Sequence, residues 1–549
     1  MAPSDGSAVL GERSGASVGV SGERKGSMYD KTVSRRAFIT LGAAAAVTAS
    51  AMASGCAPGQ QGTSEPLAAA GSGAEDIQWT QEADVVVVGF GGAGGAAAIE
   101  AARGGAEVVL LEELDQAGGS TVACGGSILM AATPLQKKFN IEDSTEAFYA
   151  YMCAAGGGAA NEEALKVLCD FSPELYDWCV SCGMDFEGGD LYPGAHINSF
   201  NKTGYTLFYT GNEQARAYAR VTPPVPRGHS SLPNSSGKDI FDALAATVDS
   251  LGVQVMTGTP GKRLVQDERG RVVGVIAGAK DDVAIRARKA VILTAGGFGN
   301  NEKMMAEHYV YPNPRGVGII SAGNDNGTGI LMGQSVGAAT FGMGSFQLGR
   351  PLSTMGDALA RGLIMGESGR RLVAEDEYNT FVGKAVGLAL TERCFAVYDE
   401  AARTEGAPEN FLGDPVAICG SLAEVAETIG ADADVVASTF AFYNESASLG
   451  EDREFGKDPQ FMIPFKEGPF SVYACGSESC MVGSLGGLKI DVDAHVLDLS
   501  DEIIPGLYAA GRNSGSIFGW YMGSGASVAD VLTFGIIAGR NASQESIEA

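Results

Sequence analysis

The strongest constraint on the fold is a glycine-rich turn that joins a buried strand to a helix. Residues 84–88, Asp-Val-Val-Val-Val, are the kind of short apolar run that lies inside a parallel sheet. Residues 89–94 follow at once and read Gly-Phe-Gly-Gly-Ala-Gly, and the Ala-rich residues 95–103 have a helical pattern. A second apolar run, residues 106–111, ends at Glu112. Strand, G-x-G-x-x-G turn, helix, strand and acid together form the fingerprint of a dinucleotide-binding unit.

Each position of this unit has a physical role in holding a dinucleotide. Gly89 makes the tight turn, Gly91 lets the backbone approach a pyrophosphate, and Gly94 lets the helix pack closely on the strand. The N–H groups at the start of the helix point at the phosphates, and Glu112 can hydrogen-bond a ribose hydroxyl. The residues predicted to contact the dinucleotide here are Gly89, Gly91, Gly92, Ala93, Gly94, Glu112 and Glu113. The fingerprint by itself fits both NAD and FAD.

A second glycine-rich turn, at residues 118–126, separates these two cofactors. It reads Gly-Gly-Ser-Thr-Val-Ala-Cys-Gly-Gly and resembles the flavin-side loop of the fumarate reductase and succinate dehydrogenase flavoprotein superfamily. In that superfamily the loop wraps the ribityl chain and the isoalloxazine ring. The resemblance therefore implies FAD as the cofactor, with contacts from Gly118, Gly119, Ser120, Thr121, Cys124, Gly125 and Gly126.

Segments in the middle and at the end of the chain carry the same resemblance. Residues 290–299 and 504–512 look like strands that return the chain to the cofactor, and residues 253–256 and 272–275 look like neighbouring strands. The glycine turn at 523–530 leads into a closing helix, whose first amides would stabilise the negative charge of a reduced flavin. The contacts implied here are the Gly525 amide together with Ala295, Gly296, Gly297, Gly511, Arg512, Ala526, Ser527 and Val528.

The resemblance runs from about residue 80 to the C-terminus and implies an α/β fold with an inserted domain. A chain of 549 residues is long enough for two domains. A Rossmann-like FAD-binding domain (GR2 type) is predicted from two stretches, residues 80–340 and 478–549. Residues 341–477 lack the glycine turns and resemble the superfamily's α+β capping domain, which closes over the flavin and excludes water.

One segment of the predicted capping domain resembles the part of the superfamily that supplies a proton. Residues 369–379 resemble the G-R-R-F-x-N-E segment, and Arg371 within it is a candidate site residue. Fumarate reductases carry an arginine acid a few residues further on, whereas Tyr378 and Asn379 stand here. Because the 3-ketosteroid dehydrogenase branch carries a tyrosine near this point, Tyr378 is expected to donate a proton, or to return one as phenolate if neighbours lower its pKa. The alternative is a tyrosine packed at the edge of the capping domain.

A second segment, residues 518–525, indicates a ketone rather than a dicarboxylate. Met522 stands where dicarboxylate-specific members have a clamping arginine, and Gly483 stands where the superfamily has a clamping histidine. In the ketosteroid branch a Tyr followed four residues later by a Gly binds the substrate carbonyl, and Tyr521 and Gly525 have that spacing. A phenol O–H and a backbone N–H on one oxygen act like an oxyanion hole. An enone such as a 3-oxosteroid is therefore expected; the alternative for Tyr521 is a ring stacked on the flavin.

The expected reaction moves a hydride between flavin N5 and a carbon–carbon bond. Reduction of a C=C bond is favoured, and its reverse, as in a 3-ketosteroid-type dehydrogenase, is an alternative. A fumarate- or urocanate-type carboxylate reductase is another, and it would need Arg371 or Arg227 as its cationic clamp. A flavin-binding protein without turnover is the third. Since no haem-attachment motif is found, a membrane-linked or periplasmic electron donor is the expected partner.

The first 56 residues predict an export signal. Residues 34–39 read Ser-Arg-Arg-Ala-Phe-Ile and precede a weakly apolar run at residues 41–52, as in a twin-arginine signal peptide. Cys56 ends a sequence that resembles a lipoprotein cleavage site, although Ala53 replaces the usual large aliphatic residue. Residues 57–79 are expected to be a tether. The mature protein is thus expected in the periplasm or on the outer face of the cytoplasmic membrane, either free or held by a lipid.

Charge and cysteine content bear on other classes of function. The formal net charge of −28 opposes binding to nucleic acid. Among the 10 cysteines, Cys179 lies near Cys182 and Cys475 near Cys480, but the spacing does not supply the four ligands of a zinc or iron–sulfur site. No metal is therefore predicted, with an iron–sulfur cluster as the alternative. His495 is expected to lie in a hairpin-like turn without a chemical role.

Overall fold

The computed structural model describes residues 77–192, 204–211, 213–214, 218–311, 318–319, 321–349, 360–389, 393–406, 414–475 and 481–546. The predicted signal peptide, most of the tether, Cys56 and Cys480 lie outside these residues. Within them, every helix is too short or too polar to cross a bilayer. We call residues 77–349 and 481–546 the main region, and residues 360–475 the capping segment.

The main region is built on a mixed sheet. Its strands are β1 (Gln81–Val88), β2 (Val108–Leu111), β7 (Gln254–Met256), β8 (Gly261–Gln266), β9 (Val272–Ala277), β10 (Val283–Leu293), β20 (His495–Leu497) and β21 (Ile503–Ala509). The order is β20-β21-β10-β1-β2-β7, and β9 and β8 extend the sheet antiparallel from β10. β1 runs parallel to both neighbours, and its four valines at 85–88 are buried. Burial on both faces explains why this strand is an unbroken apolar run.

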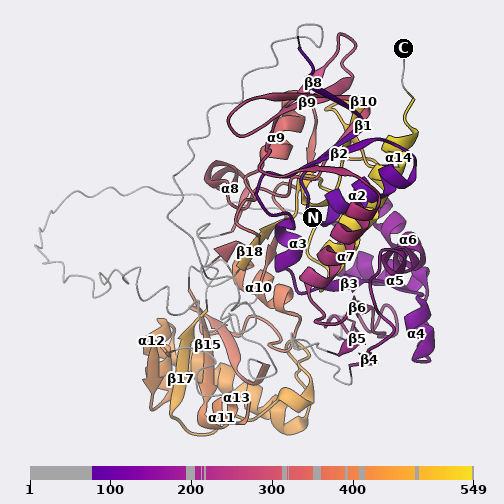
Figure 1. Cartoon of the computed structure of the whole chain (residues 1–549). Helices are drawn as coiled ribbons and strands as arrows, with labels where there is room; N and C mark the ends of the chain where they lie inside the picture. The colour runs from indigo at the N-terminus through magenta and orange to yellow at the C-terminus, as the bar shows by residue number, and fades with distance from the viewer. Residues whose placement is uncertain are drawn as a thin grey trace, which may run out of the picture. The chain divides into compact units, whose positions relative to one another are not determined.

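Two helices rich in small residues, α2 (Gly92–Arg103) and α14 (Ala526–Gln544), pack side by side against the sheet (Figure 1). A Cβ atom on Gly535 would lie 2.7 Å from the carbonyl oxygen of Ala93, and one on Gly539 would lie 2.3 Å from that of Ala97. Only glycine fits at such a close approach of two backbones. The last helix of the chain is thereby fixed against the helix that follows the glycine fingerprint.

The other helices of the main region begin mostly at polar caps. They are α3 (Gly119–Ala123), α4 (Pro134–Lys138), α5 (Thr145–Gly156), α6 (Glu162–Ser181), α7 (Gly237–Ser250), α8 (Glu302–His308), α9 (Thr328–Ser335) and the 3-10 helix η5 (Gly511–Asn513). The side chains of Ser144, Asn161 and Ser236 accept hydrogen bonds from the first turns of α5, α6 and α7. Such caps satisfy N–H groups that have no partner within the helix.

Three small sheets complete the main region. They contain β3 (Ser127–Leu129), β4 (Asp190–Leu191), β5 (Tyr205–Phe208) and β6 (Gly228–Ser230); β11 (Gly318–Ile319), β13 (Phe346–Leu348) and β18 (Met481–Ser484); and β12 (Thr340–Phe341) with β19 (Gly487–Leu488). The pairs β13–β18 and β12–β19 join chain from before the capping segment to chain from after it. Because Phe346 and Leu348 are buried in the core of the main region, β13 belongs there, although the predicted boundary was residue 341.

The capping segment has its own α+β core, drawn in orange in Figure 1. Its elements are β14 (Leu363–Gly366), α10 (Asn379–Leu388), β15 (Cys394–Asp399), α11 (Glu400–Gly406), β16 (Ala417–Cys419), α12 (Leu422–Ile429), α13 (Ala433–Leu449), the 3-10 helix η3 (Pro459–Phe461) and β17 (Phe470–Ala474). The strands form an antiparallel sheet in the order β14-β15-β17-β16. The predicted fold class, a Rossmann-like domain with an inserted α+β domain, is confirmed.

Candidate active site

A cavity lies at the N-terminus of α2, where turns from distant parts of the sequence meet. The predicted cofactor residues that line it are Gly89, Gly91, Gly92, Ala93, Glu112, Glu113, Gly119, Ser120, Thr121, Ala295, Gly296, Gly511 and Arg512. The predicted residues outside its lining are Gly94, Gly118, Cys124, Gly125, Gly126, Gly297, Ala526, Ser527 and Val528. Four separate segments of the fingerprint and the family motifs therefore share one cavity.

Two glycines of the first turn are required by contacts of the backbone. Gly89 has a φ of +105°, and a Cβ atom there would lie 2.6 Å from the carbonyl oxygen of Thr294. A Cβ atom on Gly94 would lie 1.8 Å from the carbonyl oxygen of Gly89. Neither position accepts a side chain, so the turn stays close to the strand and leaves space at the start of α2.

Two carboxylates stand where β2 ends at the cavity. Glu112 is buried and accepts hydrogen bonds from the backbone N–H groups of Phe90 and Leu114, each at 2.9 Å. Burial raises the pKa of Glu113, and the charge of Glu112 raises it further. These bonds fix Glu112 at the end of β2, and its hydrogen bond to a ribose hydroxyl stays a prediction.

Sequence reasoning missed part of the lining, including Thr259, Pro260, Asn324, Asp325, Asn326 and Thr328. Asp325 is buried and forms an ion pair of 2.8 Å with Arg512, which joins the loop before α9 to the turn after β21. The polar residues 323–327, Gly-Asn-Asp-Asn-Gly, were the available signal, because a glycine-bounded polar loop before a helix is typical of a ligand contact.

This set of donors fits FAD. The side-chain-free turn and the first amides of α2 suit a pyrophosphate, Glu112 suits a ribose, and Arg512, paired with Asp325, adds a guanidinium to the lining. The second glycine turn begins α3 beside the first, because the Thr121 hydroxyl accepts a hydrogen bond of 2.9 Å from the Gly92 N–H. The two glycine turns thus form one continuous wall.

Tyr378 and Tyr521, predicted from distant parts of the sequence, come together beside the start of α14. Tyr378 is 4% exposed, precedes α10 as its N-cap residue, and hydrogen-bonds the side chain of Ser524. The half-buried Tyr521 interacts through its hydroxyl with the backbone of Gly525 and Ser527. A phenol from the capping segment and a phenol from the main region therefore face the same turn.

Both phenols keep their protons at neutral pH. Burial raises the pKa of Tyr378 well above its usual value, and the neighbouring Tyr521 raises it further. Burial also raises the pKa of Tyr521 to about 12, with a contribution from Cys124. The hydrogen bond with Ser524 lowers the pKa of Tyr378, but burial raises it by more, so the arrangement suits proton donors rather than a phenolate base.

The turn before α14 has a geometry that only glycine permits. Gly525 has a φ of +92°, and a Cβ atom there would lie 2.8 Å from the backbone nitrogen of Leu129. The Ala526 N–H, one of the predicted flavin contacts, donates to the carbonyl oxygen of Gly523 at 3.1 Å. The chain is held here against β3 by a bond of 3.2 Å from the Leu129 N–H to the Gly525 carbonyl oxygen.

A buried carboxylate supports the far side of this turn. Glu213 accepts hydrogen bonds from the N–H groups of Thr210 and Gly211 and from the Thr210 hydroxyl, the last at 2.8 Å. Burial raises its pKa. The Tyr151 hydroxyl bonds Thr210 and donates to the carbonyl oxygen of Met522 at 3.3 Å. The segment that carries Tyr521 is therefore positioned by buried polar contacts from α5 and from the residues after β5.

Arg371, a predicted site residue, is held by carboxylates inside the capping segment. Its guanidinium lies 2.8 Å from both Glu375 and Asp452, and the side chain is 1% exposed. Lys457 lies 3.2 Å from Glu375, also fully buried. Burial alone would raise the pKa of Glu375, but Arg371 and Lys457 hold it below its usual value. In the contacts of the described residues Arg371 does not join the two tyrosines.

Arg227 is held in the same manner within the main region. Its guanidinium forms two bonds of 2.7 Å with the carboxylate of Asp143, and both side chains are 1% exposed. The rings of Phe148 and Tyr151 lie beside its guanidinium. His229 is fully buried, bonds Thr133, and has its pKa lowered to about 4 by burial. A free cationic clamp is therefore not found at Arg227.

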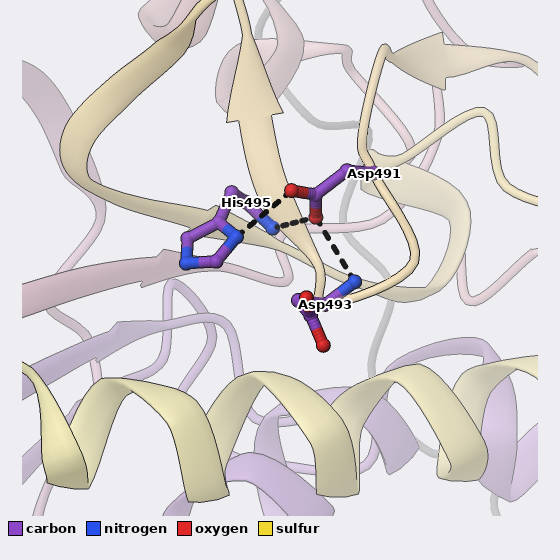
Figure 2. A group of neighbouring side chains, drawn as sticks. All are labelled: Asp491, Asp493 and His495. Carbon is purple, nitrogen blue, oxygen red and sulfur yellow. Dashed lines mark hydrogen bonds and ion pairs between the residues drawn. The ribbon is translucent and has the colours of Figure 1, made fainter.

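A different group of polar residues lies on the turn before β20 and at the first residue of that strand (Figure 2). Potential metal-ligating atoms of Asp491, Asp493 and His495 lie within 4.8 Å of one another. The Asp491 carboxylate accepts hydrogen bonds from the N–H groups of Asp493 and His495 and pairs with His495 Nδ1 at 2.9 Å. These bonds stabilise the turn, and His495 lies in the hairpin-like position expected of it. In the described part of the chain, no cysteine belongs to such a group, and Cys179 and Cys182 are buried thiols.

Comparison with known proteins gives the chain a family. Residues 84–528 match the FAD binding domain family. A urocanate reductase from Eggerthella lenta is 30% identical over 84% of this chain and 75% of its own length. A digoxin reductase from the same organism is 27% identical over 93% of this chain and 97% of its own length. The chain spans about half, 48%, of an NADH:fumarate oxidoreductase from Klebsiella pneumoniae.

Among solved structures, a 3-ketosteroid-Δ4-(5α)-dehydrogenase from Rhodococcus jostii RHA1 in complex with 4-androstene-3,17-dione is similar. It matches with a TM-score of 0.78 and 33% identity, over 86% of this chain and 99% of its own. The cavity, the paired glycine turns and these comparisons lead to one conclusion: the chain belongs to the FAD binding domain family of flavoprotein oxidoreductases, and its cofactor is FAD.

Proposed function

We propose that this FAD-dependent oxidoreductase reduces the C=C bond of an α,β-unsaturated ketone of the 3-oxosteroid type. The observation that carries the proposal is the meeting of Tyr378 and Tyr521 at the Gly525 turn. The similar dehydrogenase from Rhodococcus jostii, in complex with 4-androstene-3,17-dione, supports the choice of ketone. When bound, FAD supplies the hydride chemistry.

The residues of the chain divide the remaining work between polarisation and proton delivery. The Gly525 N–H donates to the Tyr521 hydroxyl in this structure, so the two groups lie close enough together for a substrate's ketone oxygen to take both as donors once it displaces that contact. Two donors on one oxygen stabilise the negative charge that develops there. Tyr378 then donates its proton to the carbon of the C=C bond that does not receive the hydride. The raised pKa of Tyr378 keeps that proton bound at neutral pH until it is transferred. Dehydrogenation would use the same group in reverse, as a phenolate base.

A carboxylate reductase is the second candidate, because a urocanate reductase is 30% identical to the chain. Such an enzyme needs a cation facing the substrate. Arg227 and Arg371, the two clamps expected from the sequence, are each paired with buried carboxylates. Because both arginines are already paired, they argue against a substrate that is held by a carboxylate next to its C=C bond.

We also propose export and an external electron donor. The Ser-Arg-Arg-Ala-Phe-Ile sequence at residues 34–39 supports twin-arginine transport to the periplasm or to the outer face of the cytoplasmic membrane, with Cys56 as a lipid attachment site. A reductase there requires a membrane-linked or periplasmic donor. Mass spectrometry of the mature protein from membranes tests this: an N-terminus at Cys56 carrying lipid supports the anchor, and cleavage elsewhere excludes it.

Anaerobic reoxidation of the flavin tests the proposed reaction. The purified enzyme is reduced with a viologen dye and mixed with 4-androstene-3,17-dione, simple enones, urocanate or fumarate, while flavin absorbance is followed. Rapid reoxidation by the ketones supports the proposal. Reoxidation by the carboxylates alone would contradict it and favour the second candidate, and no reoxidation by any compound would favour a flavin-binding protein without turnover.

A further inference from the structure

Lys384 is a cation beside the proposed site that the reaction does not use. It lies on α10, the helix that begins directly after Tyr378, and its ammonium nitrogen is 3.7 Å from the centre of the Trp520 ring. Trp520 precedes Tyr521 in the chain. The lysine and the tryptophan therefore link the two segments that carry the proposed acid and the proposed ketone-binding phenol.

The ammonium of Lys384 has no carboxylate partner among the described residues. Burial lowers its pKa, and no acid in that part of the chain offsets the effect. The Trp520 ring attracts the cation but offers no hydrogen-bond acceptor to its three N–H groups. This differs from Arg227, Arg371 and Lys457, each of which lies against a buried carboxylate. A half-buried ammonium that lacks a hydrogen-bond acceptor among the described residues can bind an anion that is not part of the chain.

The surroundings of Lys384 are aromatic. The centre of the Phe381 ring lies 6.0 Å from the Lys384 nitrogen. The Phe381 and Tyr218 rings meet edge to face, with their centres 5.5 Å apart. Phe381, Tyr218 and Trp520 are all half-buried rather than closed inside a core. Such rings suit a flat apolar ligand body, and the lysine adds one point of charge.

We propose that Lys384, held on the face of Trp520, binds an anionic group of the substrate. The proposal rests on the proposed function and names its substrate class: an enone with a flat apolar body that carries a carboxylate away from the reacting ketone. The carboxylate then lies against the ammonium, while Tyr521 and Gly525 hold the ketone oxygen. The cation thus selects among enones and takes no part in hydride or proton transfer.

Steady-state kinetics with two steroids test this assignment. The probes are 4-androstene-3,17-dione and 3-oxo-4-androstene-17β-carboxylate, and the variants are Lys384→Met, Lys384→Arg and, as an exposed control on α8, Lys303→Met. We expect a KM about ten-fold lower for the carboxylate in the unmodified enzyme, a gap that Lys384→Met closes and Lys384→Arg preserves. Lys303→Met should retain the gap.

Three outcomes overturn the assignment. Equal KM values for the two steroids in the unmodified enzyme, or a gap that survives Lys384→Met, would exclude an anion site at Lys384. An equal fall in kcat with both steroids in Lys384→Met would identify the lysine–tryptophan contact as a closure contact of the capping segment instead. Reduction of neither steroid would refute the proposed function itself, whereas reduction of the neutral steroid without a carboxylate preference refutes only this inference.

Discussion

The main region is packed through glycine, whereas the capping segment is packed around a buried group of charges. In the main region, Gly535 and Gly539 let α14 lie against the backbone of α2, and Gly94 lets α2 lie against the first turn. In the capping segment, Arg371 and Lys457 are enclosed with Glu375 and Asp452 at 1% exposure or less.

The two modes of packing respond differently to change. A glycine contact fails when volume is added, because two backbones have no room to separate without moving the elements that hold them. A buried charge group fails when one member is removed, because the remaining charge is left without a partner in a medium of low polarity. Close glycine contacts build the cofactor site, and a buried group of charges builds the segment that carries Tyr378.

The largest expected effect is on cofactor binding. Gly94→Ala places a Cβ atom against the Gly89 carbonyl oxygen, at 1.8 Å in the present backbone, and should lower FAD content at least about ten-fold through displacement of α2. The ratio of flavin to protein absorbance measures this. Gly420→Ala in the capping segment is the control, because its nearest contact is the flexible side chain of Glu424 at 3.5 Å. Normal FAD content in Gly94→Ala would refute the packing argument.

The next effect is on the stability of the capping segment. Arg371→Met leaves Glu375 and Asp452 buried without their shared partner and should cost about 3–5 kcal/mol in urea unfolding. Arg393→Met breaks a pair with Glu367 in which the side chains are 44% and 37% exposed, and should cost less than about 1 kcal/mol. If instead Arg371→Met keeps its stability but loses turnover, the arginine acts on the substrate as the sequence suggested.

A pH effect of intermediate size is expected in α14. Burial raises the pKa of Asp530 to about 7, and its side chain has the Ser516 hydroxyl as a partner. Because the folded state holds this proton more tightly than the unfolded state, the proton adds to the free energy of unfolding at low pH. This contribution, up to about 4 kcal/mol, is lost as pH rises from about 4 to about 7. Asp530→Asn should flatten that slope in urea titrations at several pH values. An unchanged slope would show that the carboxyl is ionised when buried.

The smallest expected effect lies at the turn of Figure 2. The hydrogen bond to Asp491 raises the pKa of His495, whose side chain is 24% exposed. A raised pKa stabilises the fold fully below the unfolded value of about 6.5, and the contribution is lost as pH rises through the folded value. His495→Gln should therefore cost less than about 1 kcal/mol at pH 5.5 and nearly nothing at pH 9. Bound Zn²⁺ that stabilises the unmodified protein and not His495→Gln would instead indicate a metal site.

The main region could be predicted in detail because its contacts leave a regular trace in the sequence. β1, α2, β2 and the closing helix α14 lie where the glycine turns and apolar runs indicated. Boundaries shifted by a few residues: α2 begins at Gly92 rather than at residue 95, and the strand expected at the start of residues 290–299 is the end of the 11-residue β10.

The capping segment and the second half of the site were less predictable. The group around Arg371 joins Arg371 and Glu375, which are four residues apart, to Asp452 and Lys457, which lie up to 86 positions away, and no sequence spacing indicates the longer contacts. The contact of Lys384 with Trp520 is likewise not indicated by spacing, whereas the polar loop at residues 323–327 carries a signal for the cavity residues Asn324 to Asn326. Tyr378 and Tyr521 were named from the sequence, but the raised pKa of Tyr378 depends on burial that only the fold creates.

In the proposed reaction a phenol, rather than an arginine, donates the proton. The most direct measurement is the single-turnover rate at which dye-reduced enzyme is reoxidised by 4-androstene-3,17-dione in Tyr378→Phe, compared with the unmodified protein and with Arg371→Lys. We expect a fall of about 100-fold or more in Tyr378→Phe, with normal FAD content, and a much smaller change in Arg371→Lys. An unchanged rate in Tyr378→Phe together with a large loss in Arg371→Lys would contradict it.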